Sequence, residues 1–541
     1  MSIPATSSDP QRPRAAPKQP DTDPLLSAGS GWVCLLAFAV ALAAGLFIQL
    51  VLLPHILPGL HAGHGLLRGG DWIGFHEDGV ALAQQIAQHG WQAFELRPRG
   101  QAPIGITAAV YVLTGIHEPW ILVPIQAAVF AIAVVGLFNI CRSIAPVRNS
   151  AIAAGLMVVF PSTVLLYAQI HKDVWALAGT LWILFAILTY TRTRTWSWRQ
   201  HAALLAITVA GIGLVWLVRA YALQIVLLGL ITAVLLFVVS NLLSAAFGGA
   251  AKPWRDMGGI AICIMLVFAG AVDSPARLAQ HVSPQIAKAI AAPNVVEGDR
   301  PVFEPILLPP NVIATLNSEQ KRLYGEQSRI DFVKTLNPQQ TASWKQYQVG
   351  VNAIVSALTP AAEVAPSWVP APVRERLTVL INLRRGEALS AVSAGSGIDY
   401  EVPIRDVWDM IRYVPRALQI ALFAPFPDTW FRHGVSPGAS IMLRLAAVEM
   451  SIAYVALLGF VPLLLFSSAA DRMKILFLCS FALPILCLLG ITIPNVGTLL
   501  RMRYGYWYVM LGLGVAGWGL ALERWRRWQS GKTIASPAAT A

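Results

Sequence analysis

The chain has 541 residues, of which 56% are hydrophobic and only 13% charged, and its formal net charge is +12. Ordinary soluble proteins are about half apolar and about a quarter charged, whereas disordered chains combine low hydrophobicity with high charge. The composition therefore excludes both classes and indicates that lipid is the solvent for much of the chain.

The segment 1–30 is rich in Pro, Ser, Asp and Arg and predicts a disordered cytoplasmic tail. It lacks the short charged region followed by an apolar stretch that marks a signal peptide. Beyond it, ten runs come close to the ~20 mostly apolar residues that a membrane-spanning helix needs. The sequence therefore predicts an all-α polytopic membrane protein with about ten transmembrane helices. The runs lie near 32–53, 120–141, 151–169, 174–190, 203–219, 220–243, 257–273, 443–467, 474–493 and 505–522.

The spacing of these runs divides the chain into modules. We expect an N-terminal transmembrane module at 31–273, which contains a first external loop at 54–119. A large external insert follows at 274–437; it holds 17 of the 36 prolines and 14 of the 28 acidic residues, a composition unlike that of the spans. C-terminal transmembrane helices then occupy 438–524, and a cytoplasmic tail follows at 525–541.

The basic residues indicate which side of the membrane each loop faces. With the amino terminus in the cytoplasm, most cations outside the insert fall in cytoplasmic segments, as the positive-inside rule requires. The cytoplasmic loops then account for the positive net charge, so nucleic acid is not expected as a partner. Four cations break the rule in short external turns, and charge at the membrane edge usually has a function. They are Lys172, Arg219, Arg501 and Arg503.

The first external loop carries three acids ahead of an apolar pattern. They are Asp71, Glu77 and Asp78, and the residues that follow them alternate at helical spacing until a glycine at position 90. A second short apolar stretch comes after Arg97 and Arg99. Both stretches are too short to cross a bilayer, so they predict two helices that lie at the membrane surface.

Three histidines stand close to these acids in the sequence, namely His61, His64 and His76. With the acids they could hold a divalent metal, although their spacing matches no standard zinc pattern. The five cysteines all lie in or at the edge of apolar runs, which is typical of small apolar side chains rather than of a metal or disulfide framework. A divalent metal is thus the one cofactor that the sequence leaves open.

These features resemble the polyprenyl-phosphate-dependent glycosyltransferases of the GT-C membrane fold, among them protein O-mannosyltransferases and lipid A aminoarabinose transferases. The likeness rests on an acid soon after the first span, an Ala-rich surface helix that ends in Gly, and the segment Pro103–Gly115. It continues in the turn His171-Lys172-Asp173, and the segment 495–504 resembles an Arg-bearing external segment of some bacterial exopolysaccharide members. The likeness covers roughly 32–240 and does not cover 274–437.

The resemblance implies an enzyme of the bacterial inner membrane. It would move a sugar from a polyprenyl-phosphate-linked donor to an envelope polysaccharide or glycolipid acceptor on the extracytoplasmic face. A first-loop acid would act on the acceptor, as a general base or through a metal. Asp71 is the best match, but Trp72 follows it where many members have an Asp-Glu pair. Glu77 and Asp78 therefore stay open as alternatives.

The donor phosphate needs cations to stabilise its charge as it leaves. The four external cations, Lys172, Arg219, Arg501 and Arg503, share one rim by topology alone, so we expect them to bind that phosphate. A further set would support them from the same rim, and we expect the acid and the cations to meet there. The supporting residues are Asp173, Arg97 and Arg99.

Two other classes of protein remain alternatives. A polysaccharide polymerase or ligase would act in the same compartment and would carry a large external loop like 274–437. A transporter or a scaffold of an envelope-export complex would usually show matching repeats in two halves. No such symmetry is visible here, since seven predicted spans precede the insert and three follow it.

Overall fold

The structure is a computed structural model. It describes residues 26–191, 196–246, 254–272, 335–345, 358–394, 397–431 and 437–530, with 312, 315–317 and 320. Most of the predicted tails 1–30 and 525–541, and most of the first half of the insert 274–437, lie outside the described residues.

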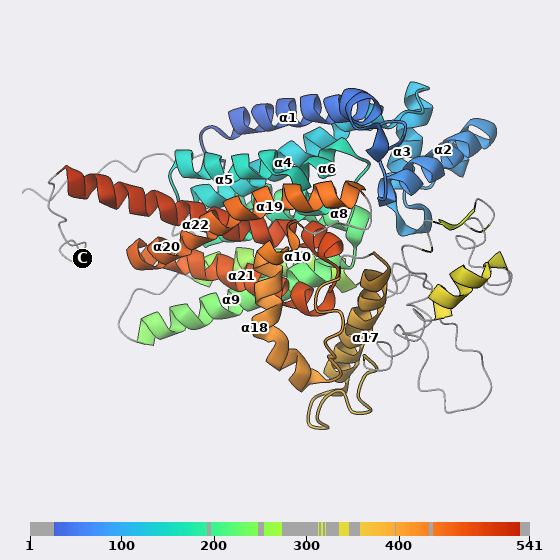
Figure 1. Ribbon diagram of the computed structural model, residues 1–541. Helices are drawn as coiled ribbons and strands as arrows, with labels where there is room; N and C mark the ends of the chain where they lie inside the picture. Colours follow the sequence, from blue (N-terminus) through green and yellow to red (C-terminus); the bar gives the residue numbers. More distant parts are fainter. Residues whose placement is uncertain are drawn as a thin grey trace, which may run out of the picture.

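The protein is an all-α, multi-pass membrane protein, as predicted from its apolar runs. Within the described residues, eight helices are long and apolar enough to span a bilayer. Most of them run side by side in one bundle (Figure 1). They are α1 (Ser30–Phe47, continued by η1, Ile48–Ile56), α4 (Val123–Arg142), α7 (Asp173–Tyr190), α8 (Trp198–Arg219), α9 (Ala222–Ala246), α19 (Pro437–Leu458) with α20 (Phe460–Phe466), α21 (Ala469–Thr492) and α22 (Val496–Gln529).

The other two predicted spans differ from simple transmembrane helices. The run 151–169 forms two helices, α5 (Val147–Val159) and α6 (Pro161–Ala168), that are bent by 67° at Phe160. Pro161 is the cause, because proline has no N–H to continue the α5 hydrogen bonds and starts a new helix instead. The run 257–273 lies in α10 (Trp254–Val272), whose apolar part is shorter than a full span.

The first external loop folds into a small unit with its own apolar core. It contains the hairpin of β1 (His61–Gly63) and β2 (Leu66–Leu67), and the two predicted surface helices, α2 (Asp71–His89) and α3 (Ala102–Thr114). The helix α2 begins at Asp71 and ends at Gly90, whose φ of 79° few other residues adopt. The core between α2 and α3 includes Trp72, Phe75 and Ile86. This packing fixes the start of α2.

The described part of the insert packs on the bundle. Helix α17 (Ala371–Ala394) contacts α21, and α18 (Val407–Phe423) packs against α21 and α22. Figure 1 shows both helices on one side of the bundle, with α2 and α3 at the end remote from the carboxyl-terminal tip of α22. The insert and the first loop therefore meet the bundle at the ends of its helices.

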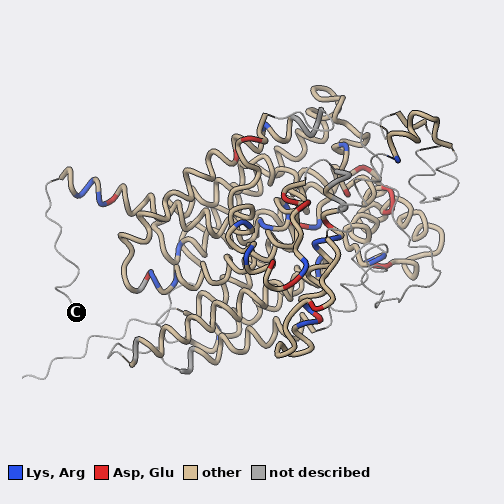
Figure 2. Tube along the Cα trace, turned by 60° about the horizontal axis from the view of Figure 1, so that its bottom comes forward, with Lys and Arg blue, Asp and Glu red and all other residues tan. Residues whose placement is uncertain are grey.

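Charged residues gather at the ends of the bundle, and its length is largely uncharged (Figure 2). One end carries Arg142 and Lys474, whose Nζ atom donates to the Ser143 carbonyl at 2.8 Å, and the basic tip of α22 with Arg526 and Arg527. The other end holds both signs of charge and is where α2, α7 and α22 begin.

Candidate functional site

Four helix ends meet at this second end of the bundle. Asp71 is the first residue of α2 and Asp173 the first of α7, positions where the positive helix terminus favours an acid. Arg219 is the last residue of α8, where the negative carboxyl terminus of the helix favours a cation. Arg501 follows in the second turn of α22. The ends of apolar runs thus place these charges at one rim.

Arg219 and Asp173 form the inner ion pair of the site, between the guanidinium Nη2 and the carboxylate Oδ1. Only 11% of the Arg219 side chain and 5% of the Asp173 side chain are exposed. The second guanidinium nitrogen donates to the Tyr221 hydroxyl at 2.6 Å. Within the described part of the chain, Asp173 Oδ2 and Arg219 Nε have no hydrogen-bond partner although both are buried. The pair is therefore fixed inside the protein, away from solvent.

Arg501 and Asp71 form a second, outer pair at 3.2 Å between Nη1 and Oδ2. It differs from the inner pair in exposure, since 30% of the Arg501 side chain and 52% of the Asp71 side chain are accessible. Exposed ion pairs contribute little to stability, about 0–1 kcal/mol. The outer pair can therefore exchange partners without unfolding the protein.

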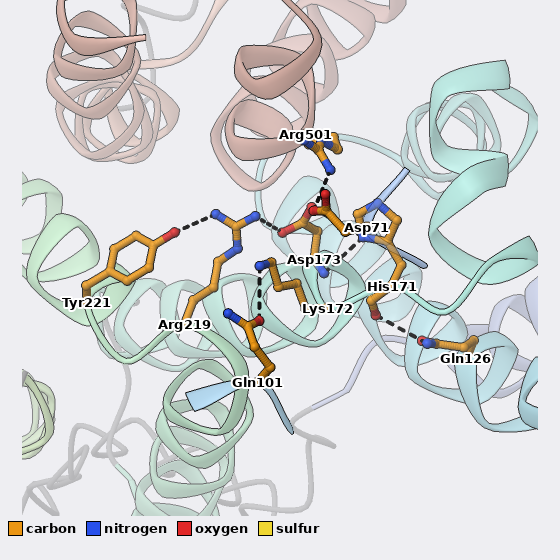
Figure 3. A network of polar contacts seen from close by, with 9 residues as sticks. All are labelled: Asp71, Gln101, Gln126, His171, Lys172, Asp173, Arg219, Tyr221 and Arg501. Atoms are coloured by element: carbon orange, nitrogen blue, oxygen red, sulfur yellow. Dashed lines mark hydrogen bonds and ion pairs between the residues drawn. The ribbon is translucent and has the colours of Figure 1, made fainter. Parts of the chain in front are cut away.

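Lys172 lies close to the inner pair (Figure 3), and the charges of both pairs act on it. Its Nζ atom donates to Gln101 Oε1 at 3.2 Å and stands 5.5 Å from the centre of the Phe75 ring. Burial lowers the pKa of Lys172, as does Arg219, while Asp173 and Asp71 raise it. Three cations therefore face two carboxylates at one place.

His171 positions Asp173 from the preceding turn. Its Nδ1 atom accepts the backbone N–H of Asp173 at 3.2 Å, and its carbonyl accepts from Gln126 Nε2 at 3.2 Å. The ring also lies 5.9 Å from that of Trp72 on α2. Burial lowers the pKa of His171 to about 4, with a smaller opposite effect of Asp173. The imidazole is therefore neutral at neutral pH.

Acidification is expected to destabilise the protein through His171. Because its folded-state pKa is depressed, the unfolded chain binds the proton first, and stability is lost as the pH falls from about 6.5 towards about 4. In His171→Gln this loss should shrink, since the side chain no longer titrates. Thermal unfolding of both proteins in detergent at several pH values measures this effect. The carboxylates titrate in both proteins, so their contribution cancels in the difference between the two curves. Parallel curves for the two proteins would contradict the assignment.

Arg503 does not join the network, although it is only two residues from Arg501. At about 100° per residue, two positions on a helix point to nearly opposite sides. The Arg503 side chain is fully buried, donates to the Ala421 carbonyl at 2.8 Å and lies 4.6 Å from the Trp507 ring centre. The geometry thus separates the two arginines that the sequence grouped together.

The remaining first-loop candidates make other contacts. Asp78 pairs with Arg99 at 3.6 Å, and both are exposed to solvent. Glu77 is also exposed. The Arg97 guanidinium lies over the Trp216 ring of α8, 4.5 Å from its centre. Of the three acids that the sequence left open, Asp71 is the one that meets the external cations.

The histidines of the first loop bind other groups of the same unit. His61 Nε2 accepts from the Gly65 backbone at 2.9 Å, His64 Nδ1 contacts the Glu118 carboxylate at 3.1 Å, and His76 Nδ1 lies 2.8 Å from the Tyr111 hydroxyl. Among the residues that the structure describes, no three His, Cys, Asp or Glu side chains are grouped as a metal ion needs. A divalent metal stays a prediction.

One acid near the network was not singled out in the sequence. Glu387 lies on α17, and Arg501 and Arg219 are the charged groups that act on its carboxyl. Burial raises the pKa of Glu387 even though both arginines lower it. The insert lies outside the family resemblance, so no motif pointed to this residue.

Comparisons with known proteins give one structural match. No family model matches the chain, and no curated protein sequence matches it. The fold is similar to the structure of the archaeal oligosaccharyltransferase AglB from Archaeoglobus fulgidus in complex with an inhibitory peptide and a dolichol-phosphate. The TM-score is 0.43 and the sequence identity 13%. The match covers 93% of this chain and 52% of that one, so the chain spans about half the length of AglB.

Proposed function

We propose that the protein is a membrane glycosyltransferase that uses a polyprenyl-phosphate-linked sugar donor. The observation that supports this most is the convergence of Asp71, Lys172, Asp173, Arg219 and Arg501. They come from parts of the chain up to 430 residues apart and meet where spanning helices end. A lipid phosphate lies at this depth of a bilayer, with its chain among the helices.

The cations suit a phosphate in two ways. Arg501 is partly exposed and can release Asp71 to bind phosphate oxygens with two parallel N–H groups, whereas Lys172 acts as a point charge. Arg219 is held in place by Asp173 and Tyr221 and needs no rearrangement. Such pre-placed cations stabilise the charge that develops on a leaving phosphate. Asp173 and Asp71 pair with Arg219 and Arg501, and Lys172 adds a further positive charge for the anion.

The charges at the opposite end of the bundle support a reaction outside the cytoplasm. Arg142, Lys474 and the basic tip of α22 lie there, and the positive-inside rule assigns such an end to the cytoplasm. The site would then face outside the cytoplasm. The bacterial inner membrane and an envelope polysaccharide or glycolipid acceptor come from the resemblance in sequence and complete the proposal.

The test is a transfer assay with the full chain in lipid nanodiscs. The donors are undecaprenyl-phosphate monosaccharides with a radiolabelled sugar, and the acceptor is the lipid and polysaccharide fraction of the host membrane. We expect label to pass to the acceptor with at least one donor. Lys172→Gln should reduce the transfer rate by about 10²-fold, as removal of one stabilising donor does.

Lys474→Gln is the matched control, because Lys474 lies at the opposite end of the bundle. It should transfer label at the wild-type rate. A chain that transfers no label and binds no undecaprenyl phosphate would contradict the proposed function. Equal losses in both lysine variants would place the phosphate elsewhere.

A further inference from the structure

Helix α18 of the insert has one face packed in the protein and one face exposed. The buried side chains recur every three or four residues, which is the spacing of one side of a helix. They are Met410, Tyr413, Ala417, Ile420 and Ala421. The opposite side carries two large apolar side chains one turn apart, Trp408, which is 50% exposed, and Ile411, which is 53% exposed. This exposed face is a candidate contact surface.

Contacts with the spanning helices show where α18 lies along the bundle. The backbone at Ala417 lies directly against Gly490, near the end of α21, with no room for a Cβ atom between them. Further along α18, the Leu422 carbonyl accepts from Trp507 Nε1 at 2.9 Å. Trp507 is three turns into α22, which places it ~16 Å from the start of that helix. Helix α18 therefore lies at the level of the spanning helices, within their last turns at the site end.

The direction of α18 differs from that of the spans. Figure 1 shows it lying across the long axis of the bundle, on one side, while the spanning helices run along that axis. A helix that lies across the spans near their ends is at the depth where hydrocarbon gives way to lipid headgroups. Its exposed face then meets the boundary region of the bilayer.

The exposed face of α18 has the chemistry of that boundary. Tryptophan is enriched at membrane–water interfaces, because its ring is apolar and its N–H is polar. Arg412 follows Trp408 by one turn, and 81% of its side chain is accessible. Its contact with Asp409 is long, at 3.9 Å. Such an arginine can cover apolar surface with its stem and bind lipid phosphate with its guanidinium.

The rest of the described insert is attached to α18. The Arg416 guanidinium binds both carboxylate oxygens of Asp399, at 2.8 and 3.0 Å, and the Tyr413 hydroxyl donates to the same carboxylate at 3.0 Å. The Asp399 carbonyl accepts from Arg384 of α17 at 2.8 Å. Whatever holds α18 in place therefore also holds α17 and the loop between the two helices.

We propose that α18 is an interfacial helix whose face of Trp408, Ile411 and Arg412 contacts the phospholipids of the leaflet nearer the site. The two apolar side chains lie among the upper parts of the acyl chains, and the Arg412 guanidinium binds lipid phosphate. The part of the insert that α18 holds is then seated in the membrane and does not stand in water as a separate domain. This contact is independent of the proposed transfer reaction.

Photocrosslinking from single positions on α18 tests this contact. The full chain, with benzoylphenylalanine in place of Ile411, is reconstituted in nanodiscs of phosphatidylethanolamine and phosphatidylglycerol, and mass spectrometry identifies the adducts after irradiation. We expect phospholipid adducts. The matched control has benzoylphenylalanine in place of Tyr413, on the buried face, and should link only to protein. Adducts from position 411 with another part of the chain or with a second copy, in place of lipid, would overturn the proposal, as would equal lipid adducts from both positions.

A second measurement introduces no bulky side chain. Lipids brominated on their acyl chains quench the fluorescence of tryptophans that lie beside them. Trp408→Phe removes one emitter and leaves the other tryptophans in place, so the difference in emission from wild type isolates Trp408. We expect this difference to be large in ordinary nanodiscs and to be mostly lost in brominated ones. An equal difference in both lipids would show that Trp408 faces water or protein and would overturn the proposal.

Discussion

Replacing Arg219 with glutamine is expected to destabilise the protein by about 3–5 kcal/mol, because it leaves the buried Asp173 carboxylate without its cation. Only 5% of the Asp173 side chain is exposed, so water cannot replace the guanidinium. The Tyr221 hydroxyl loses its donor as well. Unfolding of the full chain in mixed detergent micelles, followed by tryptophan fluorescence, measures the change.

The double variant Asp173→Asn with Arg219→Gln separates stability from function. It removes both charges, so no uncompensated charge stays buried and most of the lost stability should return. Undecaprenyl phosphate binding should not return, since the phosphate still lacks Arg219. A single variant as stable as wild type would show that the pair is not buried. A double variant that binds as tightly as wild type would remove Arg219 from the phosphate site.

The membrane fold could be predicted from the sequence because the signal for each span is local. An apolar run of sufficient length predicts a helix wherever it packs, so each of the ten runs corresponds to helical chain. Pro161 interrupts one of these runs, but the 67° bend there could not be predicted from the sequence. That angle depends on the partners of α6, among them Glu449 of α19, which accepts the Ser162 N–H at 3.0 Å. Such contacts join residues 287 positions apart.

The site was predictable to the extent that topology decides it. The sequence singles out three cations because each lies in an external turn, against the positive-inside rule that the other loops follow. They are Lys172, Arg219 and Arg501. Which acid they meet was not predictable, since Asp71 and Asp78 differ only in how α2 packs. Glu387 gave no signal, because a single acid on a helix of the insert is usually a solvated surface residue. Its position depends on the packing of α17, which Arg384 fixes through the carbonyl of Ile491, 107 residues away.

Arg501→Gln is expected to weaken undecaprenyl phosphate binding by about 10–100-fold while leaving the stability of the protein nearly unchanged. A charge-assisted hydrogen bond contributes about 1.5–3 kcal/mol, which accounts for the loss of affinity. The pair with Asp71 is partly exposed, so its removal costs about 0–1 kcal/mol. Isothermal titration of undecaprenyl phosphate into nanodiscs measures the affinity, and the detergent unfolding assay measures the stability.

Arg503→Met is the matched variant, since Arg503 stands two residues along the same helix and faces the interior. Its removal takes the Arg503 donor from the Ala421 carbonyl and the Arg503 charge from the buried Glu449. A loss of about 3 kcal/mol of stability should follow, with unchanged phosphate affinity per folded molecule. The opposite pattern, with weaker binding in Arg503→Met and instability in Arg501→Gln, would exchange the roles of the two arginines. Because both substitutions remove one positive charge from α22, a difference between them cannot arise from net charge and must come from the side of the helix on which each guanidinium lies.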